Sequence, residues 1–287
     1  MAPPSLHPLR DEDLPEFCRF LTEHLSSERT PEAWAQAFRQ NWCPDKPNNG
    51  FVIRQDGRIV GGIGAIYAER VVCGKPERFC NITSWCVLDE FRTQSGRLAM
   101  AVVSQPGFHF TDLTPTEVVS KTLQFFKFKP MDERHVVWPN VPWAIGRLRG
   151  IRLIADPDAI GGVLATEDAK AFRDHRHLPW LNHLAVGQAG AWCHVVWRRT
   201  RLKNVSGAMI LAVSDPELFL RCRLAVGSRL LLRHALPYTR IEARLLPRVA
   251  RPSFVLAGYR NKVFRSDTLT ERDISNLYSE LVALDIS

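Results

Sequence analysis

The dipeptide Asp56-Gly57 most constrains the fold, because it stands between two apolar segments rich in β-forming residues. Asp-Gly is a strong signal for a two-residue hairpin, since both turn positions need a positive φ. We therefore predict a strand over Phe51–Gln55 and a partner strand over Arg58–Val72. Gly74-Lys75-Pro76 predicts the next turn, and Phe79–Leu88 predicts a third strand. Together these segments indicate an antiparallel meander.

Helical patterns lie on both sides of this meander. Apolar spacing predicts a helix over Leu14–Leu25, and Thr30 before Pro31 begins a second helix that runs to about Trp42. After the meander we predict a polar loop over Asp89–Ser95, a helix over Gly96–Val103, a strand over Phe108–Thr111, a helix over Pro115–Phe126 capped by Thr114, and a strand beginning at Val136. This order predicts an α/β (α+β) fold with a mixed sheet.

The second half has a similar order of elements without an obvious sequence repeat. It predicts a helix opened by Asp215 and Pro216, a last helix from Thr270 to about Leu284, and strands over residues 192–197, 208–213, 238–246 and 253–264. A glycine- and acid-containing stretch over residues 156–170 predicts the boundary between two domains, residues 1–155 and 156–287.

Composition limits the class of protein. The net charge of +8 favours a ligand with phosphates, an acidic carrier protein or a nucleic acid. Seven cysteines without a paired framework favour a reduced, cytoplasmic chain, and no apolar run is long enough to span a bilayer. The start of the chain is rich in proline and lacks an apolar signal core, so we do not expect secretion.

The segment from Ile82 to Gly96 combines a strand, a short basic loop and the start of a helix. The N–H groups at a helix start bind phosphates, and the helix dipole helps them. A free strand edge binds an extended chain of amides. Coenzyme A presents a pyrophosphate and an amide-containing pantetheine arm, so this order of elements suits it.

Two segments carry a more specific resemblance. Val87-Leu88-Asp89-Glu90-Phe91-Arg92-Thr93-Gln94-Ser95-Gly96-Arg97-Leu98-Ala99 resembles the pyrophosphate motif of the GNAT superfamily of N-acetyltransferases. Thr116-Glu117-Val118-Val119-Ser120-Lys121-Thr122-Leu123-Gln124-Phe125-Phe126-Lys127-Phe128 is similar to its last-helix motif. The resemblance implies an acyltransferase that uses acetyl-CoA or another acyl-CoA and has two GNAT-like halves in tandem.

The resemblance also implies a set of site residues. We expect the acyl-CoA site to include Cys86, Val87, Leu88, Arg92, Gln94, Ser95, Gly96, Arg97 and Thr116. Two positions depart from the family pattern. Leu123 stands where the family often has a tyrosine that protonates the leaving thiolate, and Lys127 stands where it has a glycine. The motif therefore argues for binding of coenzyme A more strongly than for catalysis.

Acyl transfer to an amine needs a base and a donor to the oxyanion. A backbone N–H near Cys86–Leu88 would be the oxyanion donor. Glu69, Glu90 and His109 are weak candidates for the base, and Asp112 is another. None of them has a spacing that singles it out, so the catalytic residues stay open.

The expected acceptor is an amine of a small molecule, an amino sugar or a peptide, and an acidic acyl carrier protein is an alternative partner. Two other interpretations stay open: a non-catalytic GNAT-like scaffold, and a nucleic-acid-binding protein, for which Trp180, Trp192 and Trp197 would offer a stacking surface. Asp174, His175, His177 and His183 lie close together in sequence with His194 further on, but they show no zinc spacing, so we expect no metal.

Overall fold

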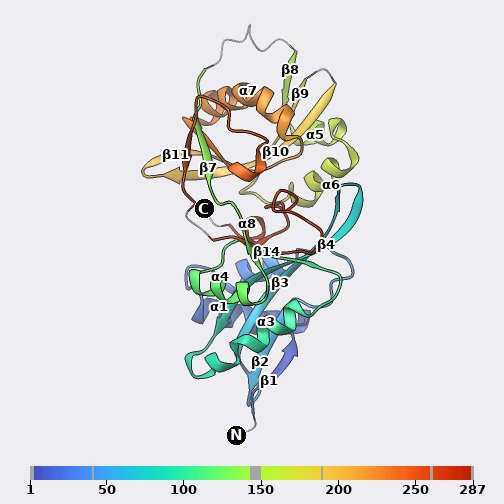
Figure 1. The fold of residues 1–287 in the computed structure, drawn as a ribbon, viewed down its shortest axis with the longest axis vertical. Helices are drawn as coiled ribbons and strands as arrows, with labels where there is room; N and C mark the ends of the chain where they lie inside the picture. The colour runs from blue at the N-terminus through green and yellow to red at the C-terminus, as the bar shows by residue number, and fades with distance from the viewer. Residues whose placement is uncertain (1–2, 41, 143–149, 189, 259–260, 286–287) are drawn as a thin grey trace. The chain divides into compact units, whose positions relative to one another are not determined.

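The computed structural model describes residues 3–40, 42–142, 150–188, 190–258 and 261–285. The chain divides into two compact units, residues 1–131 with 260–286 and residues 132–259, and each contains a seven-stranded sheet (Figure 1). Helices and mixed sheets confirm the predicted fold class. The division differs from the predicted boundary between residues 155 and 156, because the strands at residues 135–139 and 151–154 pair within the second sheet and residues 263–265 pair within the first.

The first unit contains β1 (Ser5–Pro8), α1 (Leu14–His24), α2 (Pro31–Phe38), β2 (Gly50–Gln55), β3 (Arg58–Val72), β4 (Lys75–Val87), the 3-10 helix η2 (Asp89–Gln94), α3 (Ser95–Val103), β5 (His109–Asp112), α4 (Glu117–Phe125), β6 (Lys129–Pro130), β14 (Val263–Arg265) and α8 (Glu280–Ala283), with a short 3-10 turn η1 (Asp11–Asp13) before α1. Its strand order is β1-β2-β3-β4-β5-β14-β6. The β4–β5 pair is parallel and its neighbours are antiparallel.

Strand β3 explains how helices cover both faces of this sheet. Side chains alternate between the two faces of a strand. Ile63, Ala65 and Tyr67 belong to one buried cluster with Leu98 and Val102 of α3. On the other face, a Cβ atom at Gly62 would meet the ring of Phe17 of α1, and a Cβ at Gly64 would lie 2.7 Å from Phe38 of α2. The glycines thus let two aromatic rings approach the strand backbone.

Local sequence signals predict the first part of the chain well. Asp56 and Gly57 both have positive φ, 48° and 81°, as the predicted hairpin turn requires. Thr30 accepts a hydrogen bond from the Ala33 N–H at the start of α2. This helix ends at Phe38, before the predicted end near Trp42.

The second unit contains β7 (His135–Pro139), β8 (Ile151–Ile154), α5 (Pro157–Val163), α6 (Thr166–His175), β9 (Asn182–Gln188), β10 (Ala191–Leu202), β11 (Val205–Val213), α7 (Pro216–His234), β12 (Tyr238–Glu242), the 3-10 turn η4 (Ala243–Leu245) and β13 (Phe254–Leu256). Its strand order is β13-β7-β12-β11-β10-β9-β8. Strands β11 and β12 are parallel and are joined by α7, so this unit repeats the strand–helix–parallel strand order of β4, α3 and β5.

Several predicted elements of the C-terminal part are wrong. Residues 253–264, predicted as one strand, form β13 and β14, which pair in different sheets; residues 259 and 260 lie outside the described part. The predicted strand 238–246 ends at Glu242 and continues as a 3-10 turn. The predicted helix from Thr270 to Leu284 is reduced to the four residues of α8, because this segment bonds to the first sheet: the Glu280 N–H donates to Asn81 Oδ1.

Two predictions around the motif segments also need correction. The predicted polar loop over Asp89–Ser95 is largely a 3-10 helix. The predicted helix over Pro115–Phe126 begins two residues later, since Thr116 accepts from the Val119 N–H while the Thr114 hydroxyl donates to Glu280. Among the described residues, no helix is long and apolar enough to span a membrane.

Candidate functional site

The parallel strands β4 and β5 pair over only three residues each. Phe79, Cys80 and Asn81 lie opposite His109, Phe110 and Thr111. Strand β4 then continues to Val87, paired with β3 on its other side. In the described part of the chain, no strand pairs with residues 82–87 on the β5 side. This part of β4 therefore has an open edge, where main-chain groups can bond an extended ligand.

A β-bulge lies within this open part of β4. Gly64 of β3 is opposite Thr83, but Gly62 is opposite Cys86, so β4 has one extra residue in between. Ser84 has a φ of 52°, in the left-handed region. A bulge leaves the extra residue unpaired and turns its backbone groups out of the ladder. The bulge therefore supplies polar main-chain groups to the opening between the strands.

A cavity of about 320 Å³ lies in this opening. Its walls come from the α1–α2 region, the bulge, the residues after β5 and the C-terminal segment: Leu25, Ser26, Arg29, Trp34, Thr83, Ser84, Trp85, Asp112, Thr114, Pro115, Thr116, Val119, Glu280 and Leu284. Within the described chain, three buried polar atoms of these walls have no hydrogen-bond partner: Trp34 Nε1, Trp85 Nε1 and Glu280 Oε2. Buried polar groups are normally bonded, so a ligand or a water molecule that reaches these atoms would satisfy them.

Two carboxyl groups lie together at this cavity. Asp112 is 4% exposed and Glu280 is 1% exposed. Glu280 Oε1 accepts from the Leu113 N–H at 3.0 Å and from the Thr114 hydroxyl at 2.8 Å, and Asp112 Oδ1 accepts from the Thr114 N–H at 3.2 Å. Burial, followed by the charge of Glu280, raises the pKa of Asp112 well above its ordinary value, and burial raises the pKa of Glu280 as well. The pair therefore holds a proton more readily than exposed carboxyls do.

Helix α3 follows the open edge of β4 after the 3-10 helix η2. It has neither a side-chain cap nor an acidic residue in its first turn. A Cβ atom at Gly96 would meet no atom within 4 Å, so the helix start is open. Two amides at this junction are already bonded: the Phe91 N–H of the 3-10 helix donates to Leu88 O, and the N–H of Ser95, the first residue of α3, donates to Arg92 O. Fewer free amides remain here than a polar loop would offer.

The side chains predicted to contact phosphates lie around this helix start. Arg92 pairs with Asp89 at 2.7 Å, and both side chains are largely exposed. Arg97 donates to Gln94 Oε1 at 2.7 Å and to the carbonyl of Pro4 at 3.3 Å. Exposed ion pairs are weak, about 0–1 kcal/mol, so Arg92 can exchange Asp89 for a phosphate at little cost.

The other predicted acyl-CoA residues lie after the bulge of β4 and at the start of α4. Cys86 is buried on β4, and Val87 and Leu88 are half-buried against the hydrophobic core of the first unit. Thr116 lines the cavity as the N-cap of α4. The structure thus brings the predicted segment and Thr116 to one end of the first sheet.

The weak candidates for the base lie elsewhere. Glu69 is exposed and is opposite Arg78, eight positions before Cys86 in the ladder, which corresponds to about 26 Å along β4. His109 is at the start of β5, about 10 Å along the strand from Asp112. Glu90 is exposed on the 3-10 helix. Only Asp112, the further candidate, lines the cavity.

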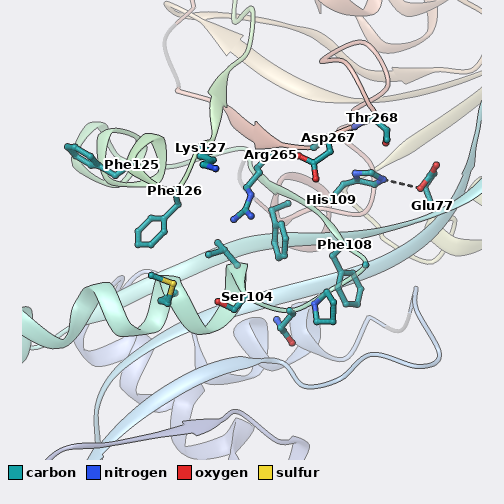
Figure 2. A pocket seen from close by; sticks show the side chains of 17 residues that line it. Glu77, Ser104, Phe108, His109, Phe125, Phe126, Lys127, Arg265, Asp267 and Thr268 are labelled. Atoms are coloured by element: carbon teal, nitrogen blue, oxygen red, sulfur yellow. Dashed lines mark hydrogen bonds and ion pairs between the residues drawn. The ribbon is translucent and has the colours of Figure 1, made fainter.

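His109 instead lies in a larger cavity of about 820 Å³ at the opposite end of these strands (Figure 2). Its Nε2 atom pairs with Glu77 at 3.0 Å, and its ring packs against Phe79. Figure 2 shows Lys127, Arg265 and Asp267 around the same space. The larger cavity is thus separated from the open edge of β4 and the start of α3.

The two departures from the family motif have clear structural consequences. Leu123 is fully buried in the core of the first unit and supplies no acid. Lys127 has a φ of 66° just beyond the C-cap of α4. The Lys127 N–H donates to Gln124 O and the Phe128 N–H donates to Leu123 O, which is the Schellman arrangement. That position favours glycine, so the lysine is accommodated at a backbone cost.

Sequence reasoning missed Trp34, Trp85 and Glu280. Glu280 falls in the segment predicted as a last helix from Thr270 to about Leu284. Glu280 reaches the cavity through contacts between residues more than 160 positions apart, such as its bond to Thr114. No local spacing could have revealed it.

The corresponding region of the second unit differs. Asp215 caps α7 by accepting from the Leu218 N–H, and Glu217 adds a second acid in the first turn. Both acids disfavour an anion at this helix start. Trp197 is 1% exposed and belongs to the core, so it offers no stacking surface.

The histidines of the second unit form a buried cluster. His183 Nδ1 and His194 Nε2 are 3.0 Å apart and their rings are stacked. Burial lowers the pKa of His175 and His183 to about 4 and that of His194 to about 3. In the part of the chain that is described, no group of three or more potential ligands is arranged to hold a metal ion.

Comparison with known proteins shows the fold. No protein-family model matches the sequence, and no curated protein matches it. A GCN5-related N-acetyltransferase from Anabaena variabilis ATCC 29413 has a TM-score of 0.59 and 10% identity, with 92% of this chain and 72% of that chain covered. The chain has the GNAT fold.

Two further structures agree. A probable N-acyltransferase from Enterococcus faecalis V583 has a TM-score of 0.58 and 12% identity, covering 92% of this chain and 73% of that one. A GCN5-related N-acetyltransferase from Kribbella flavida has a TM-score of 0.56 and 12% identity, covering 92% and 71%. The similarity extends over both units, in agreement with the predicted pair of GNAT-like halves. Similarity at such low sequence identity shows the fold but does not identify the acceptor substrate.

Proposed function

We propose that this chain is an acyl-CoA-dependent N-acyltransferase whose site lies in the first unit. The observation that carries the proposal is the open edge of β4 at residues 82–87, which adjoins both a cavity and an uncapped helix. The edge suits the pantetheine amides, and the start of α3 suits the pyrophosphate. Arg92 and Arg97 would add charge-assisted bonds to phosphate oxygens.

The acyl group would enter the cavity beside the bulge of β4. Main-chain groups turned out of the ladder at Ser84 and Trp85 would bond the thioester oxygen and stabilise the oxyanion. The amine would approach from the side of Trp34 and Glu280. The second unit is not assigned this role, because Asp215 and Glu217 occupy the start of α7.

The loss of the usual acid at Leu123 favours one competing function, a protein that binds acyl-CoA without turnover. Two measurements separate the possibilities. Coenzyme A and acetyl-CoA should raise the melting temperature of the full chain, since a ligand that binds only the folded state stabilises it. Acetyl-CoA with a panel of primary amines should release free thiol if the chain is an enzyme. Stabilisation without thiol release would indicate the non-catalytic protein.

Gly96→Trp provides a site-specific test. Its side chain would fill the open space at the start of α3, so the stabilisation by coenzyme A should be lost. Gly162→Trp is the matched control, because Gly162 is also a helical glycine at which an added Cβ would meet no atom within 4 Å, but it lies in α5. No stabilisation of the unmodified chain at millimolar ligand, or equal loss in both variants, would contradict the proposal.

A further inference from the structure

Three residues that line the cavity beside β4 each have a buried polar atom without a hydrogen-bond partner in the described chain. In the described chain, Trp34 Nε1 and Trp85 Nε1 are buried donors without a partner, and Glu280 Oε2 is a buried acceptor without one. All three residues line the same cavity. Leaving a buried polar atom unpaired costs about 1–3 kcal/mol, and more for a charged group. A ligand that accepts from the indoles and donates to the carboxylate would remove this cost.

The carboxyl pair is held in place by the chain. The Leu113 N–H and the Thr114 hydroxyl fix Glu280 Oε1, which leaves Oε2 as the free oxygen. The Thr114 N–H fixes Asp112 Oδ1. Residues 112–114 therefore position both carboxyl groups, and the Glu280 N–H is itself bonded to Asn81 at 2.9 Å.

The charges around the pair limit its ionisation. Burial raises the pKa of both acids, while the charge of Lys262, which donates to Asn276 Oδ1 at 2.9 Å, lowers the pKa of Glu280. Arg29 lines the cavity and lies over the Trp34 ring at 5.3 Å. Two carboxyl groups at one buried site do not both ionise readily. One proton shared between the two carboxyl groups leaves the pair with a single negative charge. A bound ligand with one positive charge can balance it.

We propose that Asp112 and Glu280 bind the ammonium group of the acceptor and accept its proton, and that the acceptor is a primary amine carrying a hydroxyl or carbonyl oxygen for the indole N–H groups. This inference rests on the proposed acyltransferase function. It places the binding site of the amine substrate in the first unit. The base that takes the proton of the amine is the carboxyl pair of Asp112, on β5, and Glu280, in the C-terminal segment.

The proposed reaction conserves atoms and charge. The ammonium gives one proton to the ionised oxygen of the pair, and the nitrogen lone pair then attacks the thioester carbonyl carbon, forming the C–N bond. When the tetrahedral intermediate collapses, the C–S bond breaks and its electron pair leaves on sulfur. The nitrogen loses a second proton, which sulfur takes, and the pair releases its proton to solvent. The products are an amide, a free thiol and one proton.

Matched probes test the recognition directly. Glycinamide carries an amine and a carbonyl oxygen, glycolamide replaces the amine by a hydroxyl, and n-propylamine lacks the oxygen. Calorimetric binding to the full chain should favour glycinamide over glycolamide by roughly tenfold or more, as expected for a hydrogen bond to a charged group. The preference should fall as the pH falls, because the pair becomes fully protonated. Affinity for n-propylamine should be weaker than for glycinamide.

Variants show whether the pair causes this preference. Glu280→Gln keeps a carbonyl oxygen for Leu113 and Thr114 but places an amide at the free position, so the preference for glycinamide and its pH dependence should be lost. Asp112→Asn keeps the acceptor for Thr114 and gives the same test if the first variant unfolds. Glu16→Gln is the control, because Glu16 also accepts a backbone N–H, from Ile59, but it lies outside the cavity.

The outcomes separate this inference from the proposed function. Coenzyme A should still raise the melting temperature of Glu280→Gln. The kcat/KM for thiol release from acetyl-CoA with glycinamide should fall in this variant. If coenzyme A binds but wild-type chain shows no preference for glycinamide at any pH, the inference is overturned and the proposed function stands. A preference retained in both Glu280→Gln and Asp112→Asn also overturns it. If coenzyme A does not bind, the proposed function fails and the inference fails with it.

Discussion

At the scale of single residues, burial and backbone conformation decide which functional groups are available. Glu280 and Asp112 are chemically ordinary acids that become a proton-holding pair through burial. Asp112 could be named from the sequence because it follows a predicted strand. Glu280 could not, since its place in the cavity depends on bonds to residues distant in sequence. Local chemistry therefore identifies only half of the pair.

Lys127 supplies a prediction about stability. It occupies a left-handed position after α4, which costs a non-glycine residue about 1–2 kcal/mol. Glycine removes this strain but gains entropy in the unfolded chain. Lys127→Gly should therefore raise the free energy of unfolding by roughly 1 kcal/mol. Urea denaturation measures it, and a clear loss of stability would contradict the assignment of this position.

The buried histidines predict a dependence of stability on pH. The pKa of His183 falls from 6.5 to about 4 on folding, so the unfolded chain binds more protons between these values. Stability should be fully present above pH 6.5 and should decline as the pH falls toward 4. His183→Phe should reduce the slope near pH 5 by up to about 1.4 kcal/mol per pH unit. The free energy of unfolding is measured by urea denaturation at several pH values. If it changes with pH equally in the wild-type chain and in His183→Phe, His183 is not the cause of the dependence.

At the scale of elements, hairpins and helix starts follow from local signals, whereas strand partners do not. The Asp56-Gly57 turn and the caps at Thr30 and Asp215 are confirmed. These features are predictable because the residues that form each of them lie within one turn of the chain. Residues 253–264 were predicted as one strand because periodicity cannot show that a segment divides between two sheets. A free strand edge within Ile82–Gly96 is expected from what coenzyme A needs, but the separation of β4 from β5 that provides this edge depends on distant contacts, which no local pattern shows.

The packing of α1 on β3 supplies a prediction at this scale. A Cβ atom at Gly62 would overlap the ring of Phe17, which is fully buried and has little room to move. Gly62→Ala should therefore destabilise the chain by about 1–3 kcal/mol, as overpacked core sites do. Gly162→Ala adds a methyl group in open space within a helix and should cause no loss. Equal thermal stability of the two variants would contradict the proposed close packing.

At the scale of the whole molecule, two units with the same order of strand, helix and parallel strand differ in the chemistry of their helix starts. Helix α3 is uncapped, while α7 is capped by Asp215 with Glu217 beside it. The sequence predicts two GNAT-like halves and assigns the ligand to the first. It does not predict that the C-terminal segment completes the first unit, because β14 and Glu280 reach that unit only through tertiary contacts.

Amide hydrogen exchange on the full chain, with and without acetyl-CoA, tests this assignment most directly. We expect the ligand to slow exchange over residues 82–98 and 112–117, in the open edge of β4, the start of α3 and the residues after β5. Exchange around the start of α7 should stay unchanged. Protection centred on residues 214–219 instead, or no protection at saturating acetyl-CoA, would contradict the central claim that the first unit binds acyl-CoA.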